Sequence, residues 1–414
     1  MTETLIALLL LIAAAKVGAS LAVRLRQPPV LGELAAGLVL GNLGLAGLHQ
    51  LDFLRSDSHI AFLAELGVIL LLFEVGLQSN LKEMARVGTS AFLVATVGVL
   101  VPMGLGFGLA SLLVPHTSFA VPLFLGASLS ATSVGITARV FQDLGYTRTP
   151  EAQIVLGAAV IDDVMGLVVL AVVGGIIGAA NGTASLSLLS LLLIVGKAAA
   201  FLVGAVLVGV ALSPRLFAAA FHLKSDNVLL AGGLFICFLF SLAANAVGLA
   251  PIVGAFAAGL VLEPVHYRRF LAEGDRELGH MVEPLTAFLV PIFFVLMGVR
   301  VDLSALASPG VVLLALALTV AGALGKQACG LAVLRRGTDR LTVGIGMIPR
   351  GEVGLIFANM GLALKVGSEP ILTSATFSAI VIMVMLTTLM TPPLLKWSVG
   401  RKASGRQGEL DRVA

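Results

Sequence analysis

Two adjacent carboxylates, Asp162 and Asp163, stand in the middle of a long apolar run, with Leu156 to Ala159 before them and Leu167 to Val173 after them. Ionisable side chains at membrane depth are costly and usually functional. A structural cap or ion pair accounts for one buried aspartate but not for a second. Neighbouring helix positions differ by about 100°, so the two can face different partners. Because carboxylate oxygens suit hard cations, the pair predicts a site that holds either a proton or a metal ion.

Lys326 is the basic side chain that we expect to face this pair. It lies in an apolar stretch, between Gly322 and Cys329. A buried ammonium group needs a negative partner, so we predict an ion pair with Asp162 that opens and closes as Asp163 changes its protonation state. A static ion pair is the alternative. Cys237 and Cys329 lie in apolar stretches without metal-binding spacing and are interpreted as small core residues.

Two further stretches should interrupt their helices. Residues 128–135 are rich in hydroxyls and small side chains, and residues 344–354 contain Pro349 and several glycines. Proline removes a backbone donor and glycine weakens a helix. The second stretch also carries Arg350 and Glu352, which are expensive at membrane depth unless they are paired or face the protein interior. We expect these two charges to balance the partial charges of facing half-helix ends instead of binding the cation.

The composition excludes a soluble protein. Of the residues, 58% are hydrophobic and only 12% are charged, and mean hydropathy is +1.06, whereas soluble domains carry about 25% charged residues. With about 20 apolar residues per spanning helix, thirteen segments emerge, giving an all-α polytopic membrane protein with 13 transmembrane helices. They run approximately over 3–23, 28–48, 60–78, 88–114, 118–142, 150–180, 186–212, 227–247, 250–263, 281–299, 310–334, 341–364 and 370–397.

The basic residues give the orientation of these segments. If successive loops alternate sides, 19 of the 26 Lys and Arg residues, Arg139 among them, lie on one side, and only Arg55, Arg300 and Lys365 lie on the other. Because Lys and Arg collect in cytoplasmic loops, the amino terminus should be outside and the carboxyl terminus cytoplasmic. The net charge of +3 follows from those loops and does not suggest nucleic acid.

An internal repeat is visible at an offset of 222 residues. Residues 29–40 and 251–262 are identical at eight of twelve positions, and the same offset places Gly76 on Gly298. Residues 133–136 resemble 352–355 at an offset of 219. Each copy lies seven segments from its partner, and seven is odd, so the copies should be inverted in the membrane. Inverted repeats with discontinuous helices are typical of secondary transporters, whose substrate sites lie near the bilayer midplane.

The chain resembles the second cation:proton antiporter family, with bacterial NapA-type sodium/proton antiporters as the nearest type. The resemblance covers nearly the whole chain and is carried by residues 157–164, 131–139, 254–259 and 349–354. It implies a homodimer in the bacterial inner membrane and an elevator-like motion of a core domain. The implied division is a dimerisation domain (1–87 and 225–308), a core ion-transport domain (88–182 and 309–398), a linker helix (183–224) and a short cytoplasmic tail (399–414).

The resemblance also assigns roles. Asp163 is similar to the carboxylate that binds cation and proton, Asp162 to its companion and Lys326 to the salt-bridging lysine, while Thr132 and Ser133 match the unwound part of the first broken helix. The implied function is electrogenic exchange of cytoplasmic sodium for external protons, without an organic cofactor. Lithium or potassium is the alternative cation, and a cation channel is a further alternative. No HExxH, GxSxG or nucleotide-binding motif suggests an enzyme.

Overall fold

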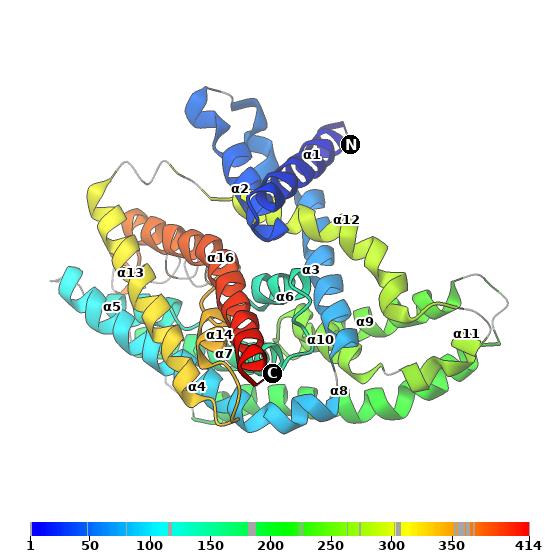
Figure 1. Cartoon of the computed structure of the whole chain (residues 1–414). Coiled ribbons are helices and arrows are strands. Elements are labelled where there is room, and N and C mark those ends of the chain that lie inside the picture. The colour runs from blue at the N-terminus through cyan, green and yellow to red at the C-terminus, as the bar shows by residue number, and fades with distance from the viewer. Residues whose placement is uncertain are drawn as a thin grey trace.

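The structure, a computed structural model, is helical almost throughout (Figure 1). It describes residues 2–47, 49–79, 81–114, 118–180, 188–222, 225, 227–262, 264–272, 275–301, 303, 308–351, 354, 361, 365–366 and 369–413. The longer helices are α1 (Thr2–Arg24), α3 (Ser58–Gln78), α4 (Leu81–Leu113), α7 (Pro150–Ala180), α8 (Leu188–Ala220), α9 (Val228–Ala246), α12 (Leu278–Val299), α13 (Pro309–Gln327) and α16 (Ser374–Val413).

The remaining elements are short. The short α-helices are α2 (Pro29–Gly41), α5 (Ala120–Ser128), α6 (Val134–Asp143), α10 (Pro251–Val261), α11 (Arg268–Ala272) and α14 (Arg340–Gly346). The 3-10 turns are η1 (Leu43–Ala46), η2 (His49–Arg55), η3 (Pro264–Tyr267) and η5 (Ala328–Ala332). In the described part of the chain, the extended structure is a two-residue hairpin of β1 (Lys365–Val366) and β2 (Glu369–Pro370), paired antiparallel.

Each of the thirteen predicted segments contains a helix. Within the described ranges, eight helices are long and apolar enough to cross a membrane, and α2 and α10 are apolar but shorter. The eight lie at Thr2–Arg24, Ser58–Gln78, Arg86–Leu113, Ala199–Ala220, Val228–Ala246, Leu278–Val299, Pro309–Ala332 and Ser374–Arg401. The protein is therefore an all-helical, multi-pass membrane protein, and the number of thirteen crossings stays a prediction.

Glycines bring α2 against α12, and α10 against α3, at equivalent positions. A Cβ on Gly298 of α12 would lie 2.3 Å from the Leu34 carbonyl oxygen of α2, and a Cβ on Gly76 of α3 would lie 2.5 Å from the Phe256 carbonyl oxygen of α10. Small residues permit this close backbone approach between membrane helices. The offset of 222 that relates the repeated sequences relates both residues of one contact to both residues of the other.

Each of the two stretches predicted to be interrupted contains a non-helical part. Residues 129–133 separate α5 from α6, and residues 347–351 follow the end of α14. Hydroxyls close the end of α5, because Ser128 Oγ donates to the Leu125 carbonyl and Ser130 Oγ to the Ala127 carbonyl, both at 2.7 Å. Most of the second interrupted segment beyond Gly351 lies outside the described residues.

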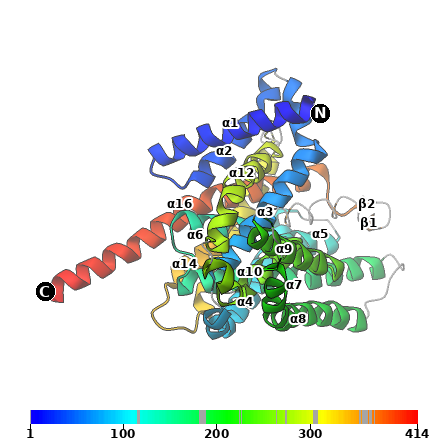
Figure 2. The same ribbon diagram turned by 90° about the vertical axis from the view of Figure 1, so that its right-hand side faces the viewer.

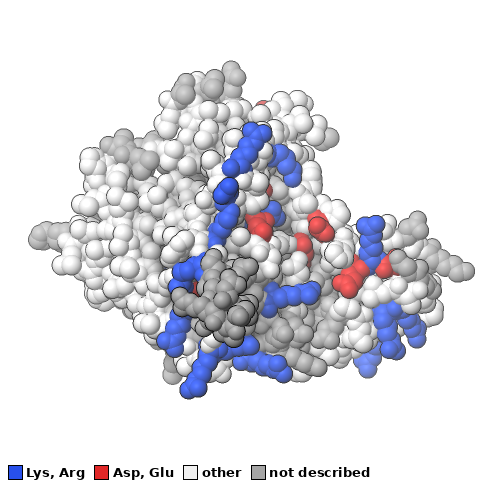
Figure 3. Space-filling view, in the orientation of Figure 1, with Lys and Arg blue, Asp and Glu red and all other residues white. Residues whose placement is uncertain are grey.

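Helix α16 projects from the body of the molecule, toward the viewer of Figure 1, and the quarter turn of Figure 2 shows its free end. Lys and Arg side chains gather on the face from which it projects (Figure 3). Near this face Asp339 accepts a hydrogen bond from Leu341 N–H at the start of α14 and pairs with Arg401 of α16 at 3.0 Å. Thr342 and Ser398 hydroxyls meet at 2.7 Å and join the same two helices.

Candidate functional site

The two non-helical stretches are hydrogen-bonded to one another. Ser133 N–H donates to the Pro349 carbonyl at 2.7 Å, and the Thr137 hydroxyl of α6 donates to the Gly346 carbonyl at the end of α14 at 2.6 Å. Interrupted backbone is tolerated within a membrane only where the freed groups find partners in the protein. The two interruptions therefore complete one another's hydrogen bonding.

Two buried basic side chains lie at the carboxyl-terminal end of α5. Lys326 Nζ donates to the Ser130 carbonyl at 2.5 Å, and Arg350 Nη2 donates to the carbonyls of Leu129 at 2.7 Å and Gly322 at 3.3 Å. Both residues are 0% exposed. A helix carries partial negative charge at its carboxyl end, where its last carbonyls lack intrahelical partners, so two cations stabilise this end. Arg350 thus lies where a charge-balancing side chain is needed.

The same lysine faces one of the paired carboxylates. Lys326 Nζ lies 3.4 Å from both carboxylate oxygens of Asp162 on α7, and neither side chain is exposed. Asp163, the next residue of α7, is half-buried. Lys326 therefore has two acceptors, the Asp162 carboxylate and the Ser130 carbonyl. If Asp162 gains a proton, the ammonium group still has the carbonyl to bind.

Thr132 and Ser133 lie in the interruption between α5 and α6 and are 2% and 1% exposed. The Thr132 hydroxyl is 3.5 Å from the Met347 carbonyl, at the limit of a hydrogen bond. The Ser133 hydroxyl is buried and has no hydrogen-bond partner among the described residues, and a Cβ on Gly351 would lie 2.5 Å from it. The described chain holds no cluster of three or more His, Cys, Asp or Glu side chains suited to a metal ion. A cation here would need hydroxyl or carbonyl oxygens besides a carboxylate.

Glu74 belongs to a second group of hydrogen-bonded polar side chains, and the sequence analysis did not predict which residues contact it. Its Oε1 accepts from Gln142 Nε2 of α6 at 2.7 Å and from Gln78 Nε2 at 3.3 Å, and its Oε2 accepts from the Thr286 hydroxyl of α12 at 2.7 Å. Glu74 is 4% exposed. An acidic residue in an apolar segment marks such a group, but its partners come from segments far apart in the sequence.

Arg139 was counted in the sequence with the loop residues of the basic side, although it falls within the predicted segment 118–142. It lies within α6, where its Nε is 3.0 Å from Asp143 and its Nη2 is 4.0 Å from Glu33 of α2. The predicted helix was correct here, but the basic side chain turns into the protein because two acids lie beside it. Glu352, the other predicted charge-balancing residue, lies outside the described residues.

Interrupted helices joined inside an apolar bundle, beside a buried carboxylate and lysine, are characteristic of membrane transporters. The transmembrane sodium/hydrogen exchanger family matches residues 7–397. The high-affinity Na⁺/H⁺ antiporter NhaS3 of Synechocystis is 37% identical, over 95% of this chain and 89% of the relative. The Na⁺/H⁺-K⁺ antiporter GerN of Bacillus cereus is 35% identical over 96% of both chains.

The fold is also found in solved structures. The sodium proton antiporter MjNhaP1 of Methanocaldococcus jannaschii superimposes with a TM-score of 0.64 at 19% identity, covering 98% of this chain and 96% of that one. At 19% identity the structural similarity supports the fold alone. With the family match and the two relatives, the chain belongs to the sodium/hydrogen exchanger family, which consists of transporters and not enzymes. The resemblance seen in the sequence is confirmed.

Proposed function

We propose that the protein exchanges sodium ions for protons across the bacterial plasma membrane. The observation that carries the proposal is the buried Asp162–Lys326 pair next to Asp163, beside two interrupted helices that bind one another. Asp163 holds either sodium or a proton, and hydroxyl or backbone oxygens of Thr132 and Ser133 complete the cation's ligands. Proton and sodium compete for this one carboxylate. In this proposal the site crosses the membrane only when one of them is bound, so the two fluxes are coupled.

The architecture proposed for this exchange is an inverted repeat divided into two units. The contacts of Gly298 with α2 and of Gly76 with α10 follow the sequence offset, which supports the repeat. The core unit comprises 88–182 and 309–398, and the unit through which two copies form a homodimer comprises 1–87 and 225–308. In this proposal the core unit moves past the other like an elevator and exposes the site to each side in turn. The amino terminus is outside and the carboxyl terminus is cytoplasmic.

Sodium is proposed as the cation because NhaS3 is described as a Na⁺/H⁺ antiporter, and GerN, described as a Na⁺/H⁺-K⁺ antiporter, makes potassium the alternative. A carboxylate alone does not select by ion size. The ligand distances set by Thr132 and Ser133 would do so.

Cation-driven proton flux in proteoliposomes tests the proposal. Vesicles with purified protein and a trapped pH dye receive pulses of sodium, lithium or potassium. We expect sodium, and lithium to a lesser degree, to drive proton movement, with an apparent sodium affinity that falls as pH is lowered because protons compete for Asp163. Larger fluxes with potassium than with sodium would identify potassium as the transported cation. Cation flux without proton movement would indicate a channel.

A further inference from the structure

One face of the short helix α6 binds two helices of the unit proposed to stay still. Arg139, Gln142 and Asp143 are spaced i, i+3 and i+4, so they project from the same side of α6. Arg139 Nη2 lies 4.0 Å from the Glu33 carboxylate of α2, and Gln142 Nε2 donates to Glu74 Oε1 of α3 at 2.7 Å. Glu33 and Glu74 are 3% and 4% exposed, so both contacts are buried.

Asp143 makes the third connection. Helix α2 begins at Pro29 after a residue, Pro28, that has no side chain able to cap it. Its first N–H groups therefore need acceptors from elsewhere. The Asp143 carboxylate lies near Val30 N–H in the first turn of α2, and an acid at this end interacts favourably with the helix dipole. The start of α2 thus faces an acidic side chain of α6.

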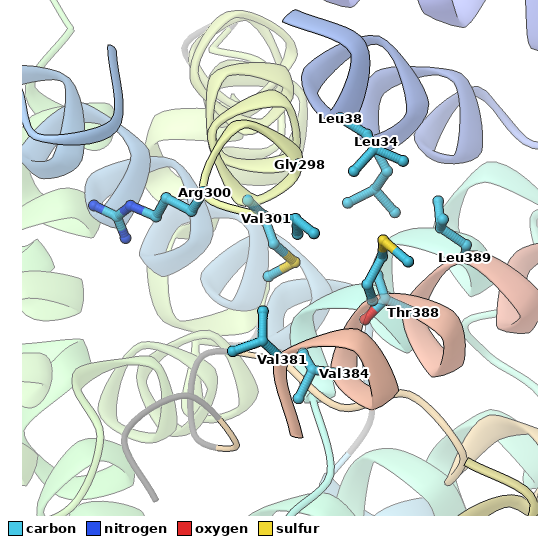
Figure 4. A pocket seen from close by; sticks show the side chains of 11 residues that line it. Leu34, Leu38, Gly298, Arg300, Val301, Val381, Val384, Thr388 and Leu389 are labelled. Atoms are coloured by element: carbon cyan, nitrogen blue, oxygen red, sulfur yellow. The ribbon is translucent and has the colours of Figure 1, made fainter. Parts of the chain in front are cut away.

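The other end of the same boundary is packed differently. Where α16 meets the far ends of α2 and α12, a cavity of about 30 Å³ lies between Leu38, Val301, Val384 and Thr388, with Arg300 at its edge (Figure 4). A cavity of this size holds about one or two waters. The boundary between the two units is therefore tied by polar contacts at the end of α6 and loosely filled at the opposite end.

We propose that Arg139, Gln142 and Asp143 form a latch that closes the cytoplasmic half of the boundary between the two units and must open in every transport cycle. This inference rests on the proposed elevator-like function and on the proposed orientation, in which α6 ends at the cytoplasmic side. In that orientation the closed latch lies on the cytoplasmic side of the site, so it holds the outward-facing state. Its release frees the site to move toward the cytoplasm.

The partners within each unit make this opening reversible. When Gln142 leaves, Glu74 retains the Thr286 hydroxyl of α12 at 2.7 Å and Gln78 of its own helix at 3.3 Å. When Arg139 leaves Glu33, it retains Asp143 at 3.0 Å within α6. Removing one partner of a buried charge is costly when nothing replaces it. Here Glu74, Arg139 and Asp143 each keep a second partner, which lowers the free-energy cost of opening.

Two single-cysteine reporters test the latch in the purified full-length protein. The background replaces Cys237 and Cys329, both buried, with alanine. Val75→Cys places the inner reporter on α3, next to Glu74, at a position that is buried in the closed structure. Leu38→Cys places the outer reporter in the cavity. The rate at which N-ethylmaleimide labels each cysteine measures how often its side of the boundary opens.

Glu33→Gln with Gln142→Ala should speed labelling of the inner reporter by about tenfold and slow labelling of the outer reporter, since a hydrogen bond and a charged contact that hold the outward-facing state are removed. Gln78→Ala is the matched control, because it removes a hydrogen bond to the same Glu74 carboxylate without crossing the boundary. It should leave both rates as in the background protein.

Unchanged labelling of the inner reporter, or faster labelling of both reporters together, overturns the latch, since the second result would mean a loosened fold. If the double variant does not purify, the single Gln142→Ala variant is read by the same criteria. Labelling does not depend on transport. If the wild-type protein shows no cation-driven proton flux, the proposed function is wrong. Faster labelling of the inner reporter with slower labelling of the outer one would still show that the contacts control the boundary.

Discussion

At the scale of single residues, the proposed exchange depends on Asp163. Asp162 is committed to Lys326 at 3.4 Å, and both are wholly buried, whereas Asp163 is only half-buried. The two neighbouring acids therefore stand in different surroundings despite their identical chemistry. That difference supports the proposed assignment of the exchangeable proton and cation to Asp163, with Asp162 in a supporting role.

We expect Asp163→Asn to abolish cation-driven proton flux, because an amide can neither take up a proton nor supply an anionic ligand. Expression and oligomeric state should be unchanged, as measured by size-exclusion chromatography. Asp275→Asn, in an exposed position, is the control and should retain full flux. Normal flux in Asp163→Asn would refute the assignment.

Lys326→Gln should lower the thermal stability of the purified protein, since it leaves the Asp162 charge buried without its cation. Removal of one partner of a buried ion pair costs about 3–5 kcal/mol. The double variant Asp162→Asn with Lys326→Gln should be more stable than Lys326→Gln alone, because no unpaired charge remains. Unfolding temperatures of the wild type, of the single variants Asp162→Asn and Lys326→Gln, and of the double variant measure this coupling. Additive losses would contradict a direct pair.

At the scale of helices, the interruptions and the close glycine contacts position the side chains of the site. Helix α5 stops at Ser128, and the carbonyls of Leu129 and Ser130 just beyond it bind Arg350 and Lys326. A continuous helix would have bonded these carbonyls internally and left each cation with one acceptor fewer. The interruption is thus the feature that permits two buried positive charges beside one aspartate.

Gly298→Ala should destabilise the protein, because its Cβ would lie 2.3 Å from the Leu34 carbonyl oxygen and backbone must move to admit it. Overpacking of this kind costs about 1–3 kcal/mol. Gly104→Ala in α4 is the control, since nothing lies within 4 Å of its Cβ position. There alanine should stabilise the helix by about 0.5–1 kcal/mol. Opposite shifts of the unfolding temperature are expected, and equal shifts would contradict the close approach.

The whole molecule determines how many charges cross the membrane in one cycle. If Asp163 alone exchanged a proton for sodium, no net charge would move. Sodium binding that also breaks the Asp162–Lys326 pair releases a second proton from the coupled groups, which titrate together. Two protons against one sodium then move one net charge, and a potential of 100 mV contributes about 2.3 kcal/mol per cycle.

We therefore expect exchange to respond to membrane potential. In proteoliposomes with potassium and valinomycin, an inside-negative potential should change both the rate and the end point of sodium-driven proton movement. The same vesicles with the potential clamped to zero are the control. A rate and end point indifferent to potential would show electroneutral exchange, with Lys326 as a fixed structural partner.

Hydropathy and the spacing of special residues were enough to predict most of the helices and the chemical groups of the site. Asp162, Asp163 and Lys326 stand out because burial of charge in an apolar segment is costly. Pro349 and its neighbouring glycines indicate an interrupted helix from the sequence alone. Hydrophobic periodicity did not reveal that Arg139 turns inward, because a basic residue near a helix end is equally compatible with a loop.

The sequence by itself determined the membrane class, the repeat and the identity of the charged residues, since each depends on composition and spacing along one segment. Only the tertiary structure decided which carbonyls Lys326 and Arg350 bind, and that Glu33 and Glu74 meet the face of α6. These partners come from helices distant in the chain. Their meeting depends on how helices pack in three dimensions, and no local pattern encodes that packing.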